Sequence, residues 1–592
     1  MKENKKQSVL NGALILSAAV IIVKIIGAFY KMPLTSLIGG VGRGYFNSAY
    51  EIYTPLYAIS VSGLPIAVSK MVSENVALHR YREAKATFDT ALRMFFFIGF
   101  AGVALLLLIS VPYVKFVAGK DNLPSILMIV PALFFCSITS VYRGYYNGLS
   151  NMKPTAVSQI VEAFIKLAIG LSAAYLIVQF GLKQFNDGQL SGGPIVVFGK
   201  SVSDLSEAYS AIYPFSAAGA IFGVTAGTMG GMIYLILKHK FRGETFTTEQ
   251  LESSPEASSS RTISKRLVII AFPIIIASLV LSITNIIDTV TIQTRLEHAV
   301  SANPGIIYKM YSSSFEQADT LEKDIVKYLW GVYGSGVDFK NLIPSLIASL
   351  GISSIPALAA AWAVRDDEKI RNTISSVLRI TMLISLPAGI GIGVLAKPIL
   401  SVVYSSRPDI VPIAAPIVSM FGYSTALVSV SSPITNMLQA IGRADIPLKS
   451  LVLGAAVKTA SNYILVGNPE YNIKGAPIGN ILCYIAIVAI NLFYLLKVTR
   501  SKIDISTAIV KPFISSALCG ISAWAVYAGA CRFLNRGETV YIAISLALSI
   551  AAGGVAYAVS ILLLRGIVEE DVISLPKGAK IAGVLKRFNL LG

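Results

Sequence analysis

The chain has 592 residues, of which 54% are hydrophobic and 14% are charged, and its formal net charge is +18. Soluble globular domains carry about 25% charged residues, so this composition excludes an ordinary soluble domain. The basic residues lie mainly in the polar connections between apolar runs, which disfavours a nucleic acid as the partner that explains the charge.

Apolar runs of about 18 residues or more follow one another along the chain and predict membrane-spanning helices. Only helices and closed barrels satisfy the backbone in lipid, and these runs lack the alternation of barrel strands. We therefore expect an all-α polytopic membrane protein with about 14 transmembrane helices. The expected spans lie near 11–35, 48–72, 88–115, 124–147, 155–180, 208–238, 266–291, 340–364, 372–404, 409–440, 446–467, 473–497, 506–531 and 539–565.

The first expected span, 11–35, follows a basic N-terminus, and we expect it to be retained because no small-residue cleavage site follows it. Ser17, Lys24 and Lys31 are spaced by seven residues and fall on one helix face. A lysine as deep as Lys24 is costly in lipid, so we expect this face to line a polar substrate cavity. The alternative is a snorkelling Lys31 and a structural ion pair to Lys24.

The fifth expected span, 155–180, carries a second polar stripe. Gln159, Glu162 and Lys166 are spaced i, i+3, i+7, and a glutamate four residues before a lysine is the favourable order for a side-chain pair. Such a pair needs a wet or protein-lined surface, so these residues are candidates for the same cavity. The alternative is a pair that locks this span to a neighbouring helix.

Further charges lie inside the expected spans. Arg93, Arg143, Arg379 and Lys511 are close enough to span ends for their head groups to snorkel to the interface. Lys458 is expected in the interior.

A polar, serine-rich stretch near 241–260 divides the chain near its middle and predicts a flexible cytoplasmic linker. The span after it, 266–291, carries Asn285 and Asp288 on a polar stripe. We expect both to face the cavity, where Asp288 would pair with a lysine, hold a coupling cation, or do both. The connection near 292–339 is long and mixed in charge, and its pattern assigns it no role.

The basic residues of the connections alternate along the chain as the positive-inside rule requires. With the N-terminus in the cytoplasm, the even number of spans returns the basic C-terminal tail to the same side. We therefore expect both termini in the cytoplasm.

Three sequence matches in chain order indicate a duplication with parallel repeats, provided that 181–207 is an insertion in the first half. The matches are Pro65 with Pro356, Pro154 with Pro447, and GAIFG at 219–223 with GAPIG at 475–479. The expected regions are an N-lobe of six spans over 1–240, a linker over 241–265, a C-lobe of six spans over 266–502, and two extra spans with a basic tail over 503–592.

The four cysteines lie in apolar runs without paired spacing, and the three histidines lie scattered in polar connections. The cysteines are expected to pack as small apolar residues. We expect no catalytic site, no metal site and no cofactor.

Four motifs carry a resemblance to a known family. They are VKIIGAFYKMPL in the first span, SGLPIAVSKMVSE in the second, YRGYYNGLSNMKPTAVSQIVE at the fourth and fifth, and NMLQAIGRADIP at the tenth and eleventh. The chain resembles the multidrug/oligosaccharidyl-lipid/polysaccharide exporter superfamily over nearly its whole length. The branch that it resembles is the polysaccharide-biosynthesis branch of stage V sporulation protein B and the MurJ-type lipid II flippases.

This resemblance implies two six-helix lobes around a central cavity that opens alternately to either side of a bacterial cytoplasmic membrane. It implies undecaprenyl-pyrophosphate-linked sugars, lipid II above all, as substrates. Lys24 and Lys31 fall where the family has basic residues in its first span, although arginine is common there in relatives. The two extra spans resemble those of MurJ-type members, which use a groove beside them for the lipid tail.

The leading hypothesis is a flippase for a lipid-linked cell-wall precursor, in contact with membrane lipids and driven by membrane potential, Na⁺ or H⁺. One alternative is an exporter of another lipid-linked polysaccharide. A second is a cation-coupled multidrug exporter, which would need cavity carboxylates such as Glu162 and Asp288. A membrane-embedded transferase is disfavoured because the histidines are scattered.

Overall fold

The computed structural model describes residues 9–61, 63–242, 246–345, 347, 358–359, 361–501, 504–534, 538–569 and 586. The described chain is almost entirely helical. It divides into two compact units, each assembled from two separate stretches. Unit 1 comprises Met1–Thr294 with Asp319–Gly331, and unit 2 comprises Arg295–Ala318 with Val332–Gly592.

The predicted lobes would have divided at the linker over 241–265. The compact units divide instead within the helix that follows the linker, α8 (Ser260–Ala302), whose first 35 residues (260–294) pack with unit 1. The sequence repeat that motivated the lobe boundaries stays a prediction. Consistent with it, Pro154 and Pro447 each lie in the first turn of a helix that packs against the next helix along the chain.

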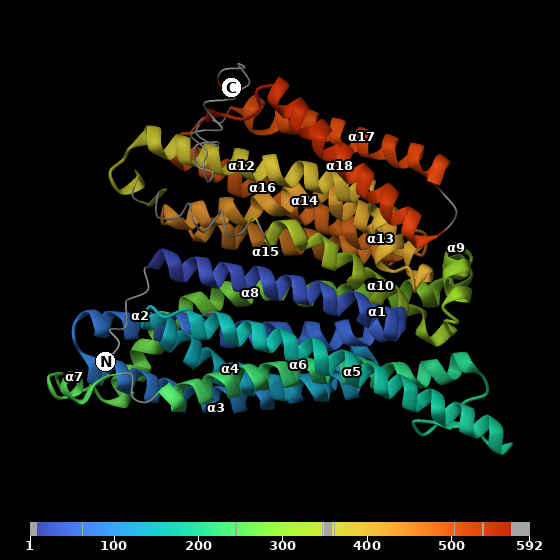
Figure 1. Cartoon of the computed structure of the whole chain (residues 1–592), viewed down its shortest axis with the longest axis horizontal. Coiled ribbons are helices and arrows are strands. Elements are labelled where there is room, and N and C mark those ends of the chain that lie inside the picture. The colour runs from blue at the N-terminus through green and yellow to red at the C-terminus, as the bar shows by residue number, and fades with distance from the viewer. Residues whose placement is uncertain are drawn as a thin grey trace. The chain divides into compact units, whose positions relative to one another are not determined.

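Unit 1 is a bundle of long helices. Its elements are α1 (Val9–Val61), α2 (Gly63–Ala77), α3 (Tyr81–Tyr113), the π-helical turn η1 (Val114–Ala118), η2 (Lys120–Asn122), α4 (Leu123–Gly148), α5 (Lys153–Ser191), the strands β1 (Val196–Val197) and β2 (Lys200–Ser201), α6 (Leu205–Arg242), α7 (Thr248–Glu252), most of α8, η3 (Glu322–Asp324) and the start of α10 (Ile325–Lys340). In Figure 1, α5 and α6 run side by side, and the antiparallel hairpin β1–β2 closes their shared end.

The helix α1 contains a sharp bend at Gly39, whose φ of 63° and ψ of −175° belong to a region that only glycine occupies readily. The bend lies between the first expected span, 11–35, and the second, 48–72. The helix α1 therefore contains the first span and the beginning of the second. A second close approach joins α5 to α6, because a Cβ atom on Gly223 would overlap the backbone of Gly170. Glycine at 223 therefore lets these two helices pack backbone against backbone.

The connection predicted to be a flexible linker is packed against α3 in its described part. A capping box between Thr247 and Gln250 starts α7, and the Phe246 ring, 7% exposed, lies 5.3 Å from the Tyr81 ring. The Arg82 amide donates to Ser254 Oγ at 3.1 Å. The serine-rich composition did not predict this packing, because the packing depends on one buried phenylalanine and a few hydrogen bonds.

Unit 2 holds the end of α8 and a second helical bundle. Its further elements are α9 (Pro304–Gln317), the end of α10, α12 (Asp367–Val394), α13 (Ala396–Val403), η4 (Pro408–Ile410), α14 (Val411–Ala440), α15 (Asp445–Ser461), the π-helical turn η5 (Asn462–Val466), η6 (Asn472–Lys474), α16 (Gly475–Thr499), the π-helical turn η7 (Ser506–Val510), α17 (Lys511–Leu534) and α18 (Thr539–Leu563). The core lies between α12, α14 and α16, and α17 and α18 pack side by side at one edge of the unit (Figure 1).

The predicted insertion 181–207 and the long connection 292–339 both contain helices. Over 181–207, α5 continues to Ser191 and meets the β1–β2 hairpin, whose Val197 is fully buried in a small apolar cluster with Phe185 and Ile212. Over 292–339, the end of α8, α9 and α10 form most of the chain.

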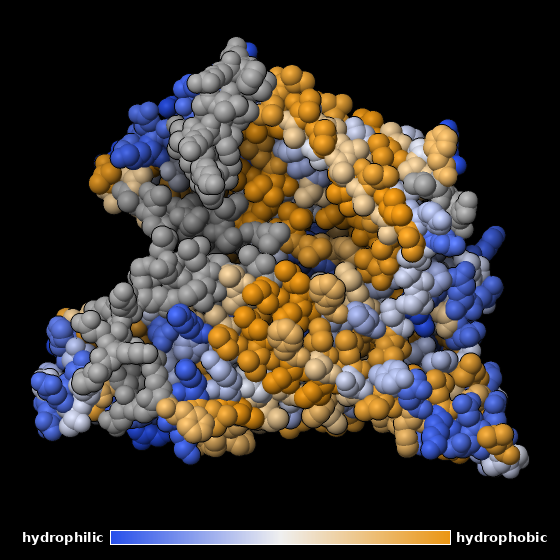
Figure 2. All heavy atoms as spheres, in the orientation of Figure 1, coloured by the Kyte–Doolittle hydropathy of each residue, from blue (hydrophilic) through white to orange (hydrophobic). Residues whose placement is uncertain are grey.

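Within the described residues, ten segments are long and apolar enough to cross a membrane. The helical membrane fold is thereby confirmed, while the count of 14 stays a prediction. The difference has local causes, because the first two expected spans join into Ala18–Ala77 and α15 has only 17 residues. About half of the expected span 340–364, including Pro356, lies outside the described residues. In Figure 2, apolar surface covers the middle of the unit 1 helices and hydrophilic surface gathers at their ends, as a bilayer requires.

Candidate functional site

The central feature of unit 1 is an ion pair between α4 and α5. An Nη of Arg143 lies 2.9 Å from Glu162 Oε2, and Arg143 Nε donates to Ser158 Oγ at 3.0 Å. The two charged side chains are 11% and 23% exposed. Arg143 was predicted to snorkel from a span end, and this is wrong, because its guanidinium is held inside unit 1 by two partners on α5.

Lys166 lies one helical turn beyond Glu162 on α5. Its Nζ lies 5.1 Å from the centre of the Tyr30 ring and 5.3 Å from the centre of the Tyr50 ring. The Tyr30 hydroxyl donates to the Ala220 carbonyl of α6 at 2.9 Å, which fixes that ring. The lysine is half-buried where α1, α5 and α6 meet.

A continuous row of aromatic rings runs along α1 beside this lysine. We call it the α1 aromatic row, and it consists of Tyr30, Phe46, Tyr50, Tyr53 and Tyr57, with successive ring centres 5.3–6.2 Å apart. The buried Arg43 guanidinium lies 5.3 Å above the Phe46 ring. The sequence analysis missed this row, although the spacing 46, 50, 53, 57 places four of its rings on one helix face.

The predicted residues of the first span are less fully placed. Lys24 is exposed on α1, and its ammonium makes no hydrogen bond or ion pair with any residue that the structure describes. Lys31 is half-buried and has polar or ring contacts. The side chain of Ser17 lies outside the described residues. Gln159 is half-buried on α5, next to the ion pair.

The polar stripe of α8 lies next to the buried side-chain amide of Gln293 on the same helix. Asp288 is 8% exposed and Asn285 is exposed. One and a half turns further, Gln293 Oε1 accepts hydrogen bonds from Ser48 Oγ of α1 at 3.2 Å and from Lys327 Nζ of α10 at 2.7 Å. Asp288 therefore lies close to a polar junction of three helices, and its role as a coupling-ion ligand stays a prediction.

Unit 2 also buries cations within its helices. Lys340 Nζ donates to Asn480 Oδ1 at 3.3 Å and lies 5.3 Å from the centre of the Phe421 ring. Lys458 and Arg379 are 2% and 9% exposed. The predicted interior position of Lys458 is confirmed, whereas Arg379 is buried rather than snorkelling.

The chemistry of this arrangement is that of binding. Cations held beside aromatic faces can attract an anionic group and stack against the apolar face of a ring. Across the described part of the chain, no group of three or more His, Cys, Asp or Glu side chains has the geometry to hold a metal ion.

Two family profiles match the chain. The profile described as "Polysaccharide biosynthesis protein" matches residues 9–182, and the profile described as "Lipid II flippase MurJ" matches residues 342–551.

Three curated proteins of Bacillus subtilis (strain 168) are similar over most of the chain. "Uncharacterized membrane protein YabM" is 22% identical over 98% of both chains. "Lipid II flippase MurJ" is 25% identical over 81% of this chain and 80% of its own. "Stage V sporulation protein B" is 22% identical over 96% of this chain and 98% of its own.

Solved structures share the fold. A structure of MurJ in the inward closed conformation has a TM-score of 0.57 at 14% identity and covers 93% of this chain and 99% of its own. An inward-facing multidrug resistance transporter of the MATE family has a TM-score of 0.58 at 14% identity and covers 79% of this chain and 94% of its own. The resemblance to this exporter superfamily is confirmed, and these families and folds are those of transporters and flippases rather than of enzymes.

Proposed function

We propose that the chain is a flippase that moves a lipid-linked, diphosphate-bearing cell-wall precursor across the bacterial cytoplasmic membrane, and that lipid II is its substrate. The observation that carries the proposal is the Lys166 ammonium, held over the rings of Tyr30 and Tyr50 next to the Arg143–Glu162 pair. The fold shared with MurJ and MATE transporters, and the MurJ profile match, support lipid-linked transport.

The positions of the cations favour an aqueous cavity. Lys24 is exposed and lies near the middle of the expected span 11–35. A charged ammonium facing hydrocarbon at that depth is strongly unfavourable, so an exposed lysine there indicates water rather than lipid. Lys24, Lys31 and Lys166 then supply positive charge for a diphosphate, which lysine binds as a point charge.

The α1 aromatic row suits the remainder of such a substrate. Tyr50 and Tyr57 are only partly buried, so part of each side chain is accessible to a ligand in the cavity. Aromatic faces pack against apolar surface while the tyrosine hydroxyls keep a polar edge. A sugar presents both kinds of surface, so the row is a suitable platform for the glycan beside a bound diphosphate.

The ion pair disfavours the multidrug alternative. A cavity for organic cations needs an available carboxylate, and Glu162 already accepts a charge-assisted hydrogen bond from Arg143 at 2.9 Å. Asp288 is the remaining predicted carboxylate, and it is buried. The balance of accessible charge in unit 1 therefore favours an anionic substrate.

The bend at Gly39 gives α1 two segments that can move separately, as alternating access requires. The orientation with both termini in the cytoplasm, and coupling to membrane potential, Na⁺ or H⁺, are parts of the same proposal.

The test is lipid II translocation in cells that are depleted of their own flippase and carry this chain. Wild type and Lys449→Ala, which changes an exposed lysine far along the sequence, should restore translocation. Lys166→Ala and Lys24→Ala should not, at equal membrane levels. Rescue by every variant would overturn the site. Failure of well-expressed wild type would overturn lipid II as the substrate, and export of other lipid-linked glycans would then be measured.

A further inference from the structure

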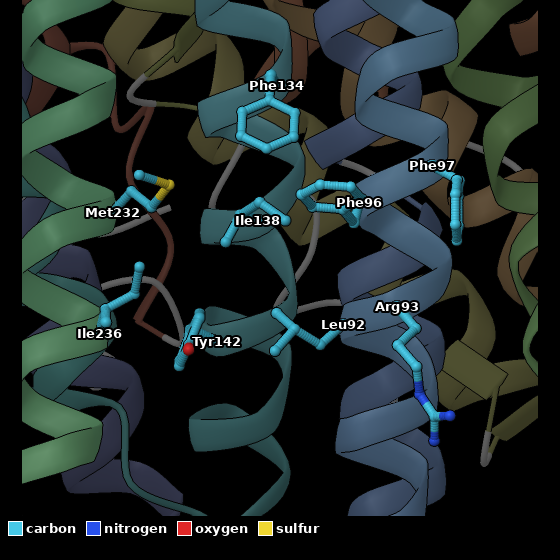
Figure 3. A pocket seen from close by; sticks show the side chains of 9 residues that line it. All are labelled: Leu92, Arg93, Phe96, Phe97, Phe134, Ile138, Tyr142, Met232 and Ile236. Atoms are coloured by element: carbon cyan, nitrogen blue, oxygen red, sulfur yellow. The ribbon is translucent and has the colours of Figure 1, made fainter.

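A cavity on the surface of unit 1 lies between α3, α4 and α6, with a volume of about 580 Å³ (Figure 3). We propose that this groove binds an acyl chain of an anionic phospholipid, whose phosphate contacts Arg93. The inference is independent of the proposed function, because the groove shares no residue with the site described above.

The lining of the groove is apolar and faces outward. Phe96 and Phe97 on α3 are 45% and 72% exposed, and the Phe96 ring centre lies 5.4 Å from that of Phe134 on α4. Met232 and Ile236 of α6 form the opposite wall (Figure 3). In a membrane-spanning region such exposed rings face lipid rather than water. The cavity also falls within the range of about 300–1,000 Å³ that ligand sites occupy.

The position of Arg93 places one end of the groove at the membrane surface. No charged residue occurs between Arg93 and Lys115, a stretch of 21 residues. At 1.5 Å per residue the two charges are about 33 Å apart, close to the ~30 Å thickness of the hydrocarbon core. Arg93 therefore lies at one interface, as its predicted snorkelling requires, and the groove extends from it into the core.

The polar atoms of the groove gather at that same end. Figure 3 shows the Arg93 guanidinium directed toward the end that holds Tyr142, while Phe134 lies at the other end. The guanidinium is exposed, and its only described hydrogen bond is a long one of 3.4 Å from Nε to the Asp89 carbonyl. Its other N–H groups make no hydrogen bond within the described residues, and arginine binds phosphate through such a planar fork.

The charges of α3 favour an anionic lipid. The first turns of α3 carry three basic residues and a single exposed carboxylate. The basic residues are Arg82, Lys85 and Arg93, and the carboxylate is Asp89. The other acidic side chain there, Glu83, is buried and accepts a hydrogen bond from the Ser258 amide. The excess of positive charge at the interface attracts an anionic head group.

The groove and the proposed substrate site use different faces of α4. Phe134, Ile138 and Tyr142 follow one another every four residues and form one stripe. Arg143 lies outside this stripe and points to Glu162 on α5. A bulk phospholipid, rather than the transported lipid, is therefore the occupant that we propose.

The experiment is native mass spectrometry of the purified full chain, titrated with dioleoyl phosphatidylglycerol or dioleoyl phosphatidylcholine. Wild type should bind one phosphatidylglycerol about tenfold more tightly than phosphatidylcholine, because both lipids offer Arg93 a phosphate but the choline ammonium of phosphatidylcholine offsets that negative charge. Arg93→Gln should remove this preference. Ile138→Trp, which fills the groove, should abolish the binding of both lipids at this site.

Lys115→Gln is the matched control, because it removes the cation at the opposite end of the same membrane-spanning segment, in η1, and should leave the preference unchanged. Circular dichroism will report whether each variant stays folded. Equal phosphatidylglycerol affinity in wild type and Arg93→Gln, or undiminished binding in a folded Ile138→Trp, would overturn the proposal. So would displacement of the bound lipid by undecaprenyl diphosphate, which would make the groove part of the substrate path.

Discussion

Arg143 on α4 and Glu162 on α5 form an ion pair of 2.9 Å inside unit 1, and Ser158 holds the same guanidinium from the preceding turn of α5. The pair joins two helices that the chain connects through the short turn after Gly148. Because both charges are largely shielded from solvent, each depends on the other for compensation.

Removing one partner of this pair should destabilise unit 1. Glu162→Ala leaves the Arg143 guanidinium buried without its carboxylate, which should lower the free energy of unfolding by about 3 kcal/mol. The double change Arg143→Met with Glu162→Met should restore most of the loss, since neither charge then remains. Thermal unfolding of the purified chain in detergent measures the difference.

Asp445→Asn is the control for this prediction, because it breaks an exposed pair with Arg443. Exposed pairs contribute little, so the midpoint should scarcely move. A Glu162→Ala variant as stable as Asp445→Asn would contradict a structural role for the buried pair.

Lys166 and Tyr50 should act together in transport rather than in folding. Tyr50→Leu removes one of the rings beneath the ammonium, and a cation–π contact contributes about 1–2 kcal/mol when it is desolvated. Lipid II translocation should therefore fall about tenfold. Tyr50→Phe keeps the ring and should retain most of the rate.

The double variant Tyr50→Leu with Lys166→Met distinguishes coupling from two separate losses. If the contact matters, the double variant should be no slower than Lys166→Met alone, as expected for residues that work as one unit. Strictly multiplicative losses in the rate would mean that the two residues act independently.

The sequence predicted the polar stripe of the fifth span but not the neighbours of that stripe. Glu162 and Lys166 are four residues apart, so local spacing alone suggested that they pair with each other. The partner that the structure gives Glu162 is Arg143, nineteen residues away, because α4 and α5 are antiparallel neighbours. A pairing of this kind depends on helix packing, which periodicity does not contain.

Other differences have similar causes. The helical spans follow from apolar runs, so most were predictable to within several residues. The bend at Gly39 was not predictable, because a single residue with a positive φ bends α1 without any polar residues that would mark the end of a span. The α1 aromatic row was readable from its spacing, yet tyrosines in an apolar run resemble ordinary core residues.

Gly39 should be required for the shape of α1. Gly39→Ala places a side chain at a φ of 63° and a ψ of −175°, which should cost on the order of 1–3 kcal/mol in stability and reduce translocation. Gly27→Ala is the matched control on the same helix, because a Cβ there meets no atom within 4 Å and alanine favours a helix by about 1 kcal/mol. Equal thermal midpoints for the two variants would refute the requirement.

The docked part of the linker should protect the N-terminal end of α3. Phe246→Ala removes a ring that is 7% exposed and packs on Tyr81, so the segment around α7 should detach. Limited proteolysis near Ser254 should then become several-fold faster, because local opening exposes the backbone. Phe241→Ala is the control, since that ring is 81% exposed and its loss should leave the cleavage rate unchanged.

Asp324 should make stability depend on pH in the direction opposite to most carboxylates. Burial raises the pKa of Asp324, and the hydrogen bond that Ser210 Oγ donates at 2.5 Å offsets part of the effect. A folded-state pKa above the unfolded value of about 3.9 means that ionisation is less favourable in the folded protein. The native state is therefore destabilised as the pH rises from that value through the raised pKa. Asp324→Asn should remove this loss and raise the thermal midpoint more at pH 7 than at pH 4.

Asp366 gives the matched control of opposite sign. Its carboxylate accepts the Lys369 amide at the start of α12, and this hydrogen bond lowers the pKa of Asp366. The stabilisation is present above the unfolded pKa and is lost as the pH falls through the folded value. Asp366→Asn should therefore lower the midpoint at pH 7 and lower it less near pH 3. The two variants differ in sign because one carboxylate is buried and the other caps a helix in solvent, so a shift of the same sign in both would contradict the assignment.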